Sequence, residues 1–451
     1  PSLEALKAYA MGNEERAKGR ARESLAFYNR AVDLDPNFAM AYARIGVFYI
    51  NQEQLDTATQ YLQKSYDLRD RVSERERLYI TEKYYNYITG EIDKAVETLK
   101  TWTRLYPNDF IPHNNLSLDY QILANYDESL KEALEAVRLS PNNFTARENV
   151  VTGFLMLGRI DEAEEASKEI DKVNPESASA HGNRYLFAFL RHDQAGMDRE
   201  SAWFKGKPEE VDNIIARAYT LLYFGKLKEA EDLLKRAIEM LKTQKRAENA
   251  AKELLGLAAN QAVLGKCQQA TENAKAALTV YSGRNGRAGA GLVYAGCGDA
   301  SQAQQILNQL RTTYPSDTIL QSLMSPVMQA AIERSRGNMA EAVRLIESVR
   351  PYDRGLVTGL MNNYLRGTLY LEQRRGNEAA IEFKKIIENP TIEAFSPAHA
   401  LAHLGLGRAA TISGDSAGAL NAYRDFFAMW KDADHDLPVL VEARKEYEAL
   451  K

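Results

Sequence analysis

Apolar residues recur at every third or fourth position along most of the chain, and this pattern is interrupted at regular intervals. In one segment Tyr42, Ile45 and Tyr49 have the spacing of residues that share one face of a helix. No segment combines alternating apolar and polar residues with the β-branched content that is typical of strands. The pattern therefore predicts an all-α protein.

The interruptions follow a fixed order. A turn-forming residue is followed five positions later by a mostly small residue, at a period of about 34 residues. The pairs are Gly19 and Ser24, Glu53 and Ala58, Gly90 and Ala95, Ala124 and Ser129, Gly158 and Ala163, His192 and Met197, Gly225 and Ala230, Gly265 and Ala270, Gly298 and Ala303, Gly337 and Ala342, and Gly414 and Ala419. Gly376 and Ala380 fit if one residue is deleted. The chain therefore divides into about twelve units, with longer spacings concentrated in its second half.

Each unit has helix-breaking residues at its ends and a turn near its middle. Pro107, Pro141 and Pro175 stand between helical segments, where proline cannot continue a preceding helix. The central turn residue ends the first helix, most often as glycine, which adopts a positive φ without steric cost. We therefore expect two helices of about a dozen residues in each unit, joined by a tight turn.

The unit from Ala39 to Asp70 resembles a tetratricopeptide repeat. The residues that carry the resemblance are Tyr42, Ile45, Gly46, Tyr49, Ala58, Leu62 and Ser65. The resemblance implies a right-handed α-solenoid of about twelve helix-turn-helix units. Met197 stands where the family has a small residue and Pro326 interrupts a first helix, so we expect irregular joints at these two places.

We expect three parts along this solenoid. Residues 1–209 hold six units, residues 210–437 hold six units with longer insertions, and residues 438–451 form a capping helix. Pro438 starts this helix, and its apolar residues are available to cover the exposed face of the last unit. These residues are Leu440, Val441, Ala443, Tyr447 and Leu450.

Three segments also resemble the repeat region that follows the catalytic domain in a group of bacterial serine/threonine protein kinases and winged-helix regulators. The segments are 69–79, 112–116 and 430–434. The resemblance implies a non-catalytic sensor or output region of a larger signalling protein, in which a membrane span often separates the two halves. No kinase motif is present in this chain, so we expect no enzymatic activity. Its compartment stays open, because no signal peptide is visible.

Charges of both signs are spread along the chain. Its 57 Lys and Arg residues oppose 62 Asp and Glu residues, for a formal net charge of −5. No basic block is available to contact phosphates, so we expect no nucleic-acid partner. The longest uncharged run, at 318–332, is shorter than the ~18 residues of a spanning helix, so we expect no membrane span within this chain.

Candidate metal motifs are incomplete. A run that resembles a calcium loop, at 432–436, is followed by Leu437 where glycine is required. His399 and His403 share a helical face, but no third ligand is apparent. We therefore predict no metal and no cofactor.

The two cysteines occupy unlike positions in neighbouring turns. Cys267 follows the turn residue Gly265, whereas Cys297 precedes the turn residue Gly298. We expect their Cα atoms to lie farther apart than the limit of about 7 Å for a disulfide. The sequence therefore predicts free thiols.

The resemblance to tetratricopeptide repeats implies that the first helices line a concave face. The residues expected to bind a partner there are Ile80, Tyr84, Tyr87, Asn114, Leu118, Gln121 and Glu148. The lining is apolar, aromatic and largely neutral, and it lacks a lysine-rich clamp for a terminal carboxylate. We therefore expect a protein or peptide partner, bound as an extended segment or an amphipathic helix.

Three alternatives stay open. Tyr84 and Tyr87 also fit a packing role against the neighbouring unit. The whole array also fits a structural spacer or self-association module. A small-molecule sensor requires a closed cavity, for which the irregular joints near Met197 and Pro326 are the candidates.

Overall fold

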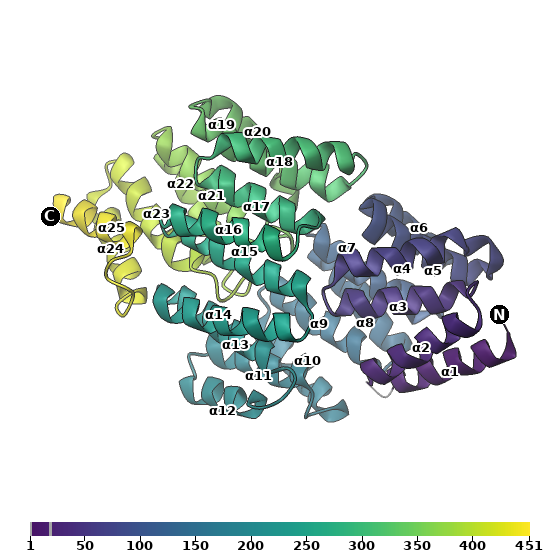
Figure 1. Cartoon of the computed structure of the whole chain (residues 1–451). Helices are drawn as coiled ribbons and strands as arrows, with labels where there is room; N and C mark the ends of the chain where they lie inside the picture. The colour runs from purple at the N-terminus through teal and green to yellow at the C-terminus, as the bar shows by residue number, and fades with distance from the viewer. Residues whose placement is uncertain (1, 18–19) are drawn as a thin grey trace.

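The computed structural model describes residues 2–17 and 20–451, and the regular structure of these residues is entirely helical. Within them, helices α1 to α24 form twelve consecutive pairs, which we number as units 1 to 12, and α25 follows the last pair (Figure 1). This arrangement confirms the predicted all-α solenoid of helix-turn-helix units with a terminal helix.

The first helices of the units are α1 (Leu3–Ala17), α3 (Ala39–Asn51), α5 (Glu74–Tyr84), α7 (Phe110–Ile122), α9 (Phe144–Met156), α11 (Ala178–Leu190), α13 (Glu210–Tyr223), α15 (Ala247–Val263), α17 (Arg284–Gly296), α19 (Ser325–Ser335), α21 (Met361–Glu372) and α23 (Ala398–Ile412). The second helices are α2 (Ala21–Leu34), α4 (Leu55–Asp67), α6 (Ile92–Leu105), α8 (Tyr126–Leu139), α10 (Ile160–Val173), α12 (Gln194–Phe204), α14 (Leu227–Thr243), α16 (Cys267–Val280), α18 (Ala300–Thr313), α20 (Met339–Ser348), α22 (Gly376–Ile387) and α24 (Ser416–Met429). The terminal helix α25 is Pro438–Ala449. Short 3-10 turns lie at η1 (Arg69–Arg71) and η4 (Arg350–Tyr352), and π-helical turns at η2 (Tyr85–Thr89) and η3 (Leu320–Met324).

The turn inside each unit is made by one residue in the left-handed backbone conformation, as predicted. Glycine takes this role in most units, and Ala124 and His192 take it with φ of 58° each. The predicted turn at Gly19 lies outside the described residues. In unit 11 the left-handed residue is Arg374, and the small buried residue five positions later is Ala379. The pairing of Gly376 with Ala380 was therefore wrong, and this unit has no deletion.

The solenoid curves so that the first helices lie on its inner side. Successive first helices contact one another, as α7 and α9 or α15 and α17 do, whereas no successive second helices in the described chain make contact to a comparable extent. The N-terminal and C-terminal ends lie at opposite ends of the molecule (Figure 1). The first helices therefore line the concave face, as the resemblance implied.

Turns of the first half contact loops of the second half, which the sequence did not predict. We call the segment before the first helix of a unit its leading loop. The backbone carbonyl of Gly90 in unit 3 accepts a hydrogen bond of 2.9 Å from the N–H of Thr318, at the start of unit 10. The carbonyl of Leu155 in unit 5 accepts one of 2.6 Å from the Thr391 hydroxyl, in the leading loop of unit 12. Each turn thus meets chain that lies about seven units further along, and we call this line of contacts the seam.

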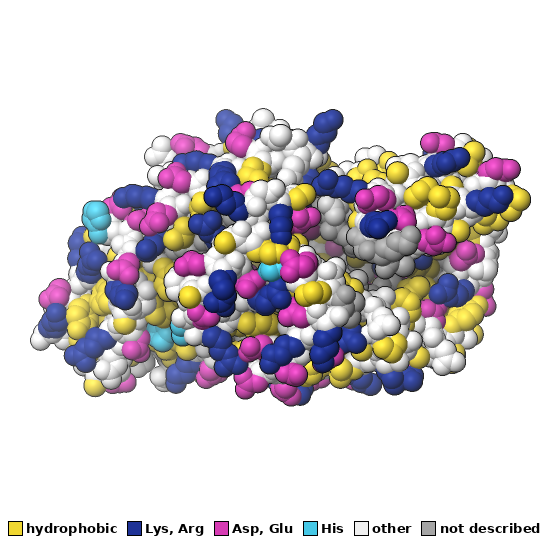
Figure 2. Space-filling view, turned by 90° about the horizontal axis from the view of Figure 1, so that it is seen from below, with side chains coloured by type: hydrophobic (Ala, Val, Ile, Leu, Met, Phe, Trp, Pro, Cys, Tyr) yellow, Lys and Arg dark blue, Asp and Glu magenta, His cyan; other side chains and the backbone are white. Residues whose placement is uncertain are grey.

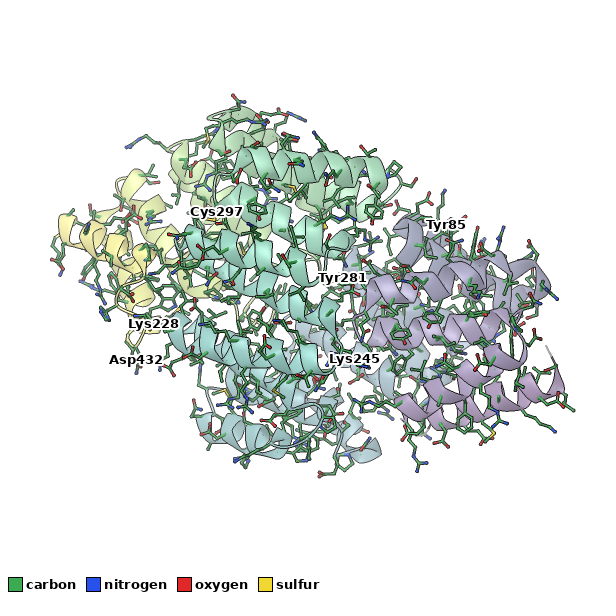
Figure 3. All side chains as sticks on the ribbon, viewed as in Figure 1. Tyr85, Lys228, Lys245, Tyr281, Cys297 and Asp432 are labelled. Atoms are coloured by element: carbon green, nitrogen blue, oxygen red, sulfur yellow. A yellow bond between two sulfur atoms is a disulfide. The ribbon has the colours of Figure 1, made fainter. Side chains whose placement is uncertain are left out.

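The seam continues at both of its ends. Tyr281, in the leading loop of unit 9, lies where the second half approaches α4 of unit 2 (Figure 3). At the other end, the Gly225 carbonyl of unit 7 accepts a hydrogen bond of 3.1 Å from the Asp434 N–H. The Asp434 carboxylate in turn accepts one of 2.8 Å from the Lys228 N–H at the start of α14. The acidic run at 432–436 therefore caps a helix across the seam.

The two expected irregular joints have different structures. Pro326 lies in the first turn of α19, directly after the π-helical turn η3, so the extra residue of that turn precedes the proline. Met197 is buried and packs in one apolar cluster with Tyr185 and Phe189 of α11. Ala394, in the leading loop of unit 12, belongs to the same cluster. The larger side chain at position 197 thus contributes to the seam.

Cys267 and Cys297 are joined by a disulfide, with their Cα atoms 5.4 Å apart, so the prediction of free thiols was wrong. Cys267 is the first residue of α16, and Cys297 directly follows the last residue of α17. Because α16 runs away from the turn edge of the solenoid and α17 runs back to it, the two residues lie at the same edge. Counting positions within each unit does not account for this antiparallel arrangement.

In the part of the chain that the structure describes, no helix has the length and apolar character needed to cross a membrane. The division of the solenoid at residues 209 and 210 remains a prediction. The seam joins the two parts on either side of this boundary.

Candidate interaction surface

The residues predicted for partner binding lie on the first helices of units 3, 4 and 5. Tyr84, Asn114, Leu118 and Glu148 are partly exposed there, and Tyr87 is partly exposed in the π-helical turn η2. The remaining two predicted residues are covered by protein: Ile80 is 1% exposed and packs in the core, and Gln121 is 2% exposed. The structure thus brings five of the predicted residues to the surface on consecutive first helices.

A chain of amide hydrogen bonds connects these helices. Asn149 Nδ2 donates to Asn114 Oδ1 at 3.0 Å, and Asn114 Nδ2 donates to Asn115 Oδ1 at 3.4 Å. Asn115 Nδ2 donates to Glu82 Oε2 at 3.3 Å. Because α5, α7 and α9 each contribute to this chain, it fixes the register of the three helices.

Unit 3 buries an ion pair where the tetratricopeptide pattern has an apolar residue and a small residue. Lys83 Nζ lies 3.0 Å from Glu82 Oε2, and the Glu82 carboxylate is fully buried. The Lys83 ammonium also lies over the rings of Tyr79 and Tyr87, at 5.8 and 5.4 Å from their centroids. Burial raises the pKa of Tyr87 to about 12, although the Lys83 cation opposes this shift. The sequence analysis missed this pair, and the charges at 82 and 83 were the available signal.

Two buried polar atoms of α7 have no hydrogen-bond partner in the described part of the protein. They are Asp119 Oδ2 and Gln121 Nε2. The other carboxylate oxygen of Asp119 accepts a hydrogen bond from Asn86. Burial raises the pKa of Asp119 well above its ordinary value, and the neighbouring Glu82 raises it further. Unit 4 therefore holds an acceptor and a donor that protein atoms leave unsatisfied.

Tyr84 makes a packing contact with the preceding unit. Its ring stacks on that of Tyr66 in α4, with centroids 3.6 Å apart. Glu148 contacts the following unit, because it accepts a hydrogen bond from the Ser179 hydroxyl of α11. Burial raises the pKa of Glu148. The roles of both residues in binding a partner remain proposals.

Further residues of the concave face lie in units 7 and 8. Tyr219 occupies the same repeat position as the predicted Tyr84 and Leu118, so extending the register would have found it. Asp212 and Lys252 lie in the N-terminal parts of α13 and α15. Tyr219 donates a hydrogen bond of 3.3 Å to Glu253. Lys252 Nζ lies 2.7 Å from Glu53 Oε2 at the turn of unit 2.

The concave face is closed between units 7 and 12. Helix α13 contacts α23, and Leu401 and Leu404 of α23 belong to the same apolar cluster as Ile214 and Leu222 of α13. Side chains from first helices therefore fill the interior of the superhelix at that end. Partly exposed lining is present in units 3 to 5.

The outer surface carries no region of one charge sign on the face shown in Figure 2, where basic and acidic side chains are interspersed. A shallow cleft of about 300 Å³ lies between α10, α11 and α12, next to the buried Met197. Charged side chains of both signs line it, including Glu164, Lys168 and Arg184. None of the predicted partner-binding residues lies in this cleft.

Comparison with known proteins identifies the repeats. Three family models described as tetratricopeptide repeat match the chain, at residues 8–38, 27–60 and 364–432. The chain therefore contains tetratricopeptide repeats. Repeats of this family suggest a scaffold for protein–protein interaction.

Solved structures that are similar to this protein include the following three. Yeast Tom70 is 12% identical, with 99% of this chain and 95% of that chain covered and a TM-score of 0.31. The Cut9–Hcn1 hetero-tetramer of the APC/C is 11% identical, with coverages of 98% and 96% and a TM-score of 0.34. YrrB, described as a TPR protein with an unusual peptide-binding site, is 20% identical, with coverages of 39% and 89% and a TM-score of 0.25. No curated protein sequence matches the chain.

Proposed function

We propose that the protein is a non-catalytic scaffold that binds a peptide or helix of a partner protein on its concave face, at units 3 to 5. The observation that carries this proposal is the row of partly exposed aromatic, apolar and amide side chains on consecutive first helices. These are Tyr84, Tyr87, Asn114, Leu118 and Glu148, whereas the other two predicted residues, Ile80 and Gln121, are covered by protein.

The chemistry of this lining suits a peptide backbone. An extended segment offers alternating N–H donors and carbonyl acceptors, so it can bind both a carboxylate and an amide side chain. Glu148 and Asn114 supply these two groups at partly exposed positions of neighbouring first helices. The partly exposed Leu118 and Tyr87 add apolar contacts of the kind that anchor interfaces.

The resemblance to repeat regions of bacterial kinases and winged-helix regulators extends the proposal. On that basis, the scaffold serves as the sensor or output region of a larger signalling protein. A full-length sequence with a kinase or DNA-binding domain joined to this solenoid supports the extension, and one without such a domain contradicts it.

The direct test uses a phage-displayed library of random twelve-residue peptides, selected on the whole chain. Leu118→Arg places a charge on the concave face and should weaken binding of the selected peptides at least tenfold. Leu134→Arg is the matched control, because Leu134 is exposed on the second helix of the same unit. Equal binding by both variants, or no selected peptide, contradicts the proposal.

A second variant separates binding from packing. Replacing Tyr84 and Tyr87 together with serine should weaken peptide binding by about 2 kcal/mol or more if they are anchors of the interface. Circular dichroism of the variant checks the helix content, which should be unchanged. Loss of helix content instead supports the packing role of these tyrosines. A concentration-dependent dimer that binds no peptide favours the self-association alternative.

A further inference from the structure

Three carboxylates from separate parts of the chain come together where unit 2 meets units 7 and 8. They are Glu53 at the turn of unit 2, Asp212 in the first turn of α13, and Glu253 in α15, and we call them the carboxylate cluster. Contacts along the start of α15 bring them together. Asn249 and Lys252 contact Glu53 at 3.4 and 2.7 Å, and Arg246, directly before α15, lies 3.9 Å from Asp212. Glu53 lies at the seam, and Asp212 lies on the first helix of unit 7.

Glu253 is a buried acid without an ion pair. Glu253 is 5% exposed, and its Oε2 accepts a hydrogen bond of 3.3 Å from the Tyr219 hydroxyl. Among the described residues, no basic side chain lies within 4.0 Å of its carboxylate. Burial raises the pKa of Glu253 and the nearby Lys252 lowers it, but Lys252 pairs directly with Glu53, at 2.7 Å. Buried carboxylates are normally in direct contact with a cation, and Glu253 has no such contact.

Asn249 provides a second, independent sign of a missing ligand. It is 3% exposed, and its Nδ2 donates a hydrogen bond of 3.4 Å to Glu53, which places the amide group at the cluster. Its Oδ1 has no hydrogen-bond partner in the described structure. Since a carbonyl oxygen only accepts hydrogen bonds, the group that completes this site is a donor.

The cluster is open to solvent on one side. The side chains of Glu53 and Asp212 are 58% and 57% exposed, so a group from outside the protein can reach them. The nearest cation to Asp212 is Arg246, at 3.9 Å, which is a weak contact. The local balance therefore favours an additional positive charge.

We propose that the carboxylate cluster receives a basic side chain of the bound protein segment, with arginine as the best fit. A guanidinium group carries five N–H donors in one plane, enough to serve the carboxylates of Asp212 and Glu253 and the Asn249 oxygen together. The inference rests on the proposed function and adds that the partner segment is basic. It also explains why a clamp for terminal carboxylates is missing from this face.

The experiment uses the same phage-displayed library on the whole chain. Selected peptides should carry arginine or lysine at one recurrent position. One such peptide is then compared with a copy in which citrulline, which is neutral and nearly isosteric, replaces the arginine. The wild-type chain should bind the citrulline peptide at least tenfold more weakly, and Asp212→Asn with Glu253→Gln should reduce this preference to less than threefold. Glu97→Gln with Glu165→Gln is the matched control, since it removes two charges from exposed second helices.

The outcomes separate this inference from the proposed function. A tenfold preference that persists in the cluster variant, or selected peptides without a recurrent basic residue, overturns the inference. If those peptides are still lost with Leu118→Arg, the proposed function stands alone. If no peptide is selected, both fail. If the double variant does not fold, Asp212→Asn alone, at an exposed side chain, should still reduce the preference at least threefold, and an unchanged preference overturns the inference.

Discussion

Two regions of the solenoid contribute opposite sides of the seam. Units 2 to 7 contribute short turns, whose backbone carbonyls accept hydrogen bonds, as at Gly90 and Gly225. The later units contribute longer leading loops and the segment before α25, which donate hydrogen bonds from Thr318, Thr391 and Asp434. The longer spacings in the second half are therefore structural parts of a contact between distant units, and not tolerated irregularities of surface loops.

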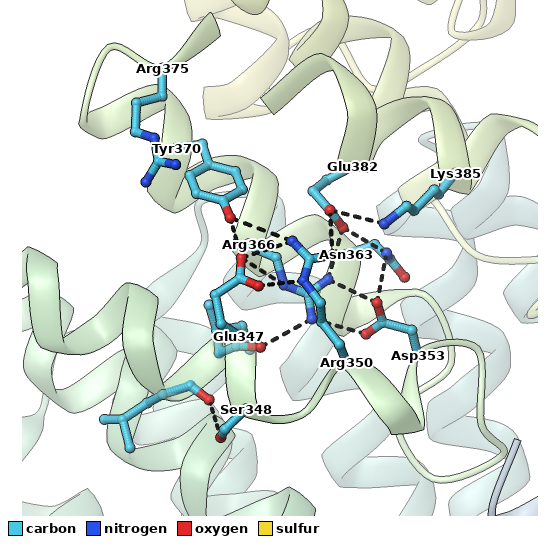
Figure 4. A network of polar contacts seen from close by, with 12 residues as sticks. Glu347, Ser348, Arg350, Asp353, Asn363, Arg366, Tyr370, Arg375, Glu382 and Lys385 are labelled. Atoms are coloured by element: carbon cyan, nitrogen blue, oxygen red, sulfur yellow. Dashed lines mark hydrogen bonds and ion pairs between the residues drawn. The ribbon is translucent and has the colours of Figure 1, made fainter. Parts of the chain in front are cut away.

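The two sides also differ in what holds them in shape. A turn of the first half needs one residue with positive φ, whereas the leading loop of unit 11 is held by a buried network of ions (Figure 4). Arg366 is fully buried, and its guanidinium contacts Asp353 at 2.9 Å, Glu382 at 2.8 Å and the Ile346 carbonyl at 3.0 Å. Burial alone would raise the pKa of Glu382, but Arg366 and hydrogen bonds from its neighbours lower it to about 2.

The largest expected effect is loss of this network. Arg366→Met leaves the carboxylates of Asp353 and Glu382 without their shared cation, and a broken buried ion pair costs about 3–5 kcal/mol. We expect a loss of that size in the free energy of unfolding, measured by urea denaturation. Arg344→Met is the control, because Arg344 is 67% exposed in its pair with Glu341 and should contribute less than about 1 kcal/mol. Equal effects of the two variants would contradict the proposed role of the network.

The disulfide is the next largest contribution, and it lies within the second half. Cys267→Ser removes a crosslink between residues 30 positions apart, and the chain-entropy model assigns about 3.6 kcal/mol to a loop of this size. Mass spectrometry of the unreduced protein should detect the Cys267–Cys297 crosslinked peptide. Thermal unfolding with and without a reductant measures its effect. Free thiols in protein kept under oxidising conditions would show that the pair does not form.

Local features of this fold were predictable from sequence, and contacts between distant units were not. Turn residues such as Gly158 act through their own backbone conformation, so their spacing alone located the units. The repeat register also predicted that Tyr84 and Leu118 lie on the same face of the solenoid. It did not find that Ile80 is covered, because coverage depends on the residues of neighbouring units. Likewise, nothing near Glu53 in the sequence indicates that Lys252 is its partner.

A smaller loss of stability distinguishes the cost of disturbing the seam contact from the cost of straining the turn backbone. Gly90 and Gly158 have φ of 72° and 73°, so alanine at either position incurs the same backbone strain, about 1 kcal/mol. A Cβ at Gly90 would overlap the Asp317 carboxylate across the seam, whereas one at Gly158 meets no atom within 4 Å. We therefore expect Gly90→Ala to lose about 1 kcal/mol more than Gly158→Ala in thermal unfolding. Equal losses would mean that the contact between Gly90 and Asp317 can rearrange without loss of stability.

The smallest effect concerns the pH dependence of the seam at unit 2. Glu248 of α15 accepts a hydrogen bond of 3.3 Å from the Asp56 N–H. An acidic residue of unit 8 therefore caps the first turn of α4. The N-cap residue of α4 itself, Gln54, makes no side-chain capping hydrogen bond. Burial and the neighbouring Asp56 raise the pKa of Glu248 from 4.5 to about 7. The protonated form is therefore favoured in the folded protein.

This shift has a defined sign. Between pH 4.5 and about 7 the unfolded chain releases the Glu248 proton while the folded chain retains it, so stability falls as the pH rises through this window. Glu248→Gln keeps a carbonyl oxygen as the cap but cannot ionise. The free energy of unfolding of the variant should match that of the wild-type protein near pH 4.5 and exceed it by about 1 kcal/mol at pH 8. This difference is smaller than the full pKa shift implies, because the Glu248 side chain is partly open to solvent. Thermal unfolding across this range checks the difference, with Glu97→Gln on the exposed face of α6 as the control. Because Glu382 has a lowered pKa, its contribution is lost only as the pH falls from 4.5 toward 2, and it is lost equally in both proteins. Equal stabilities of the variant and the wild type at pH 8 would therefore contradict the role assigned to Glu248.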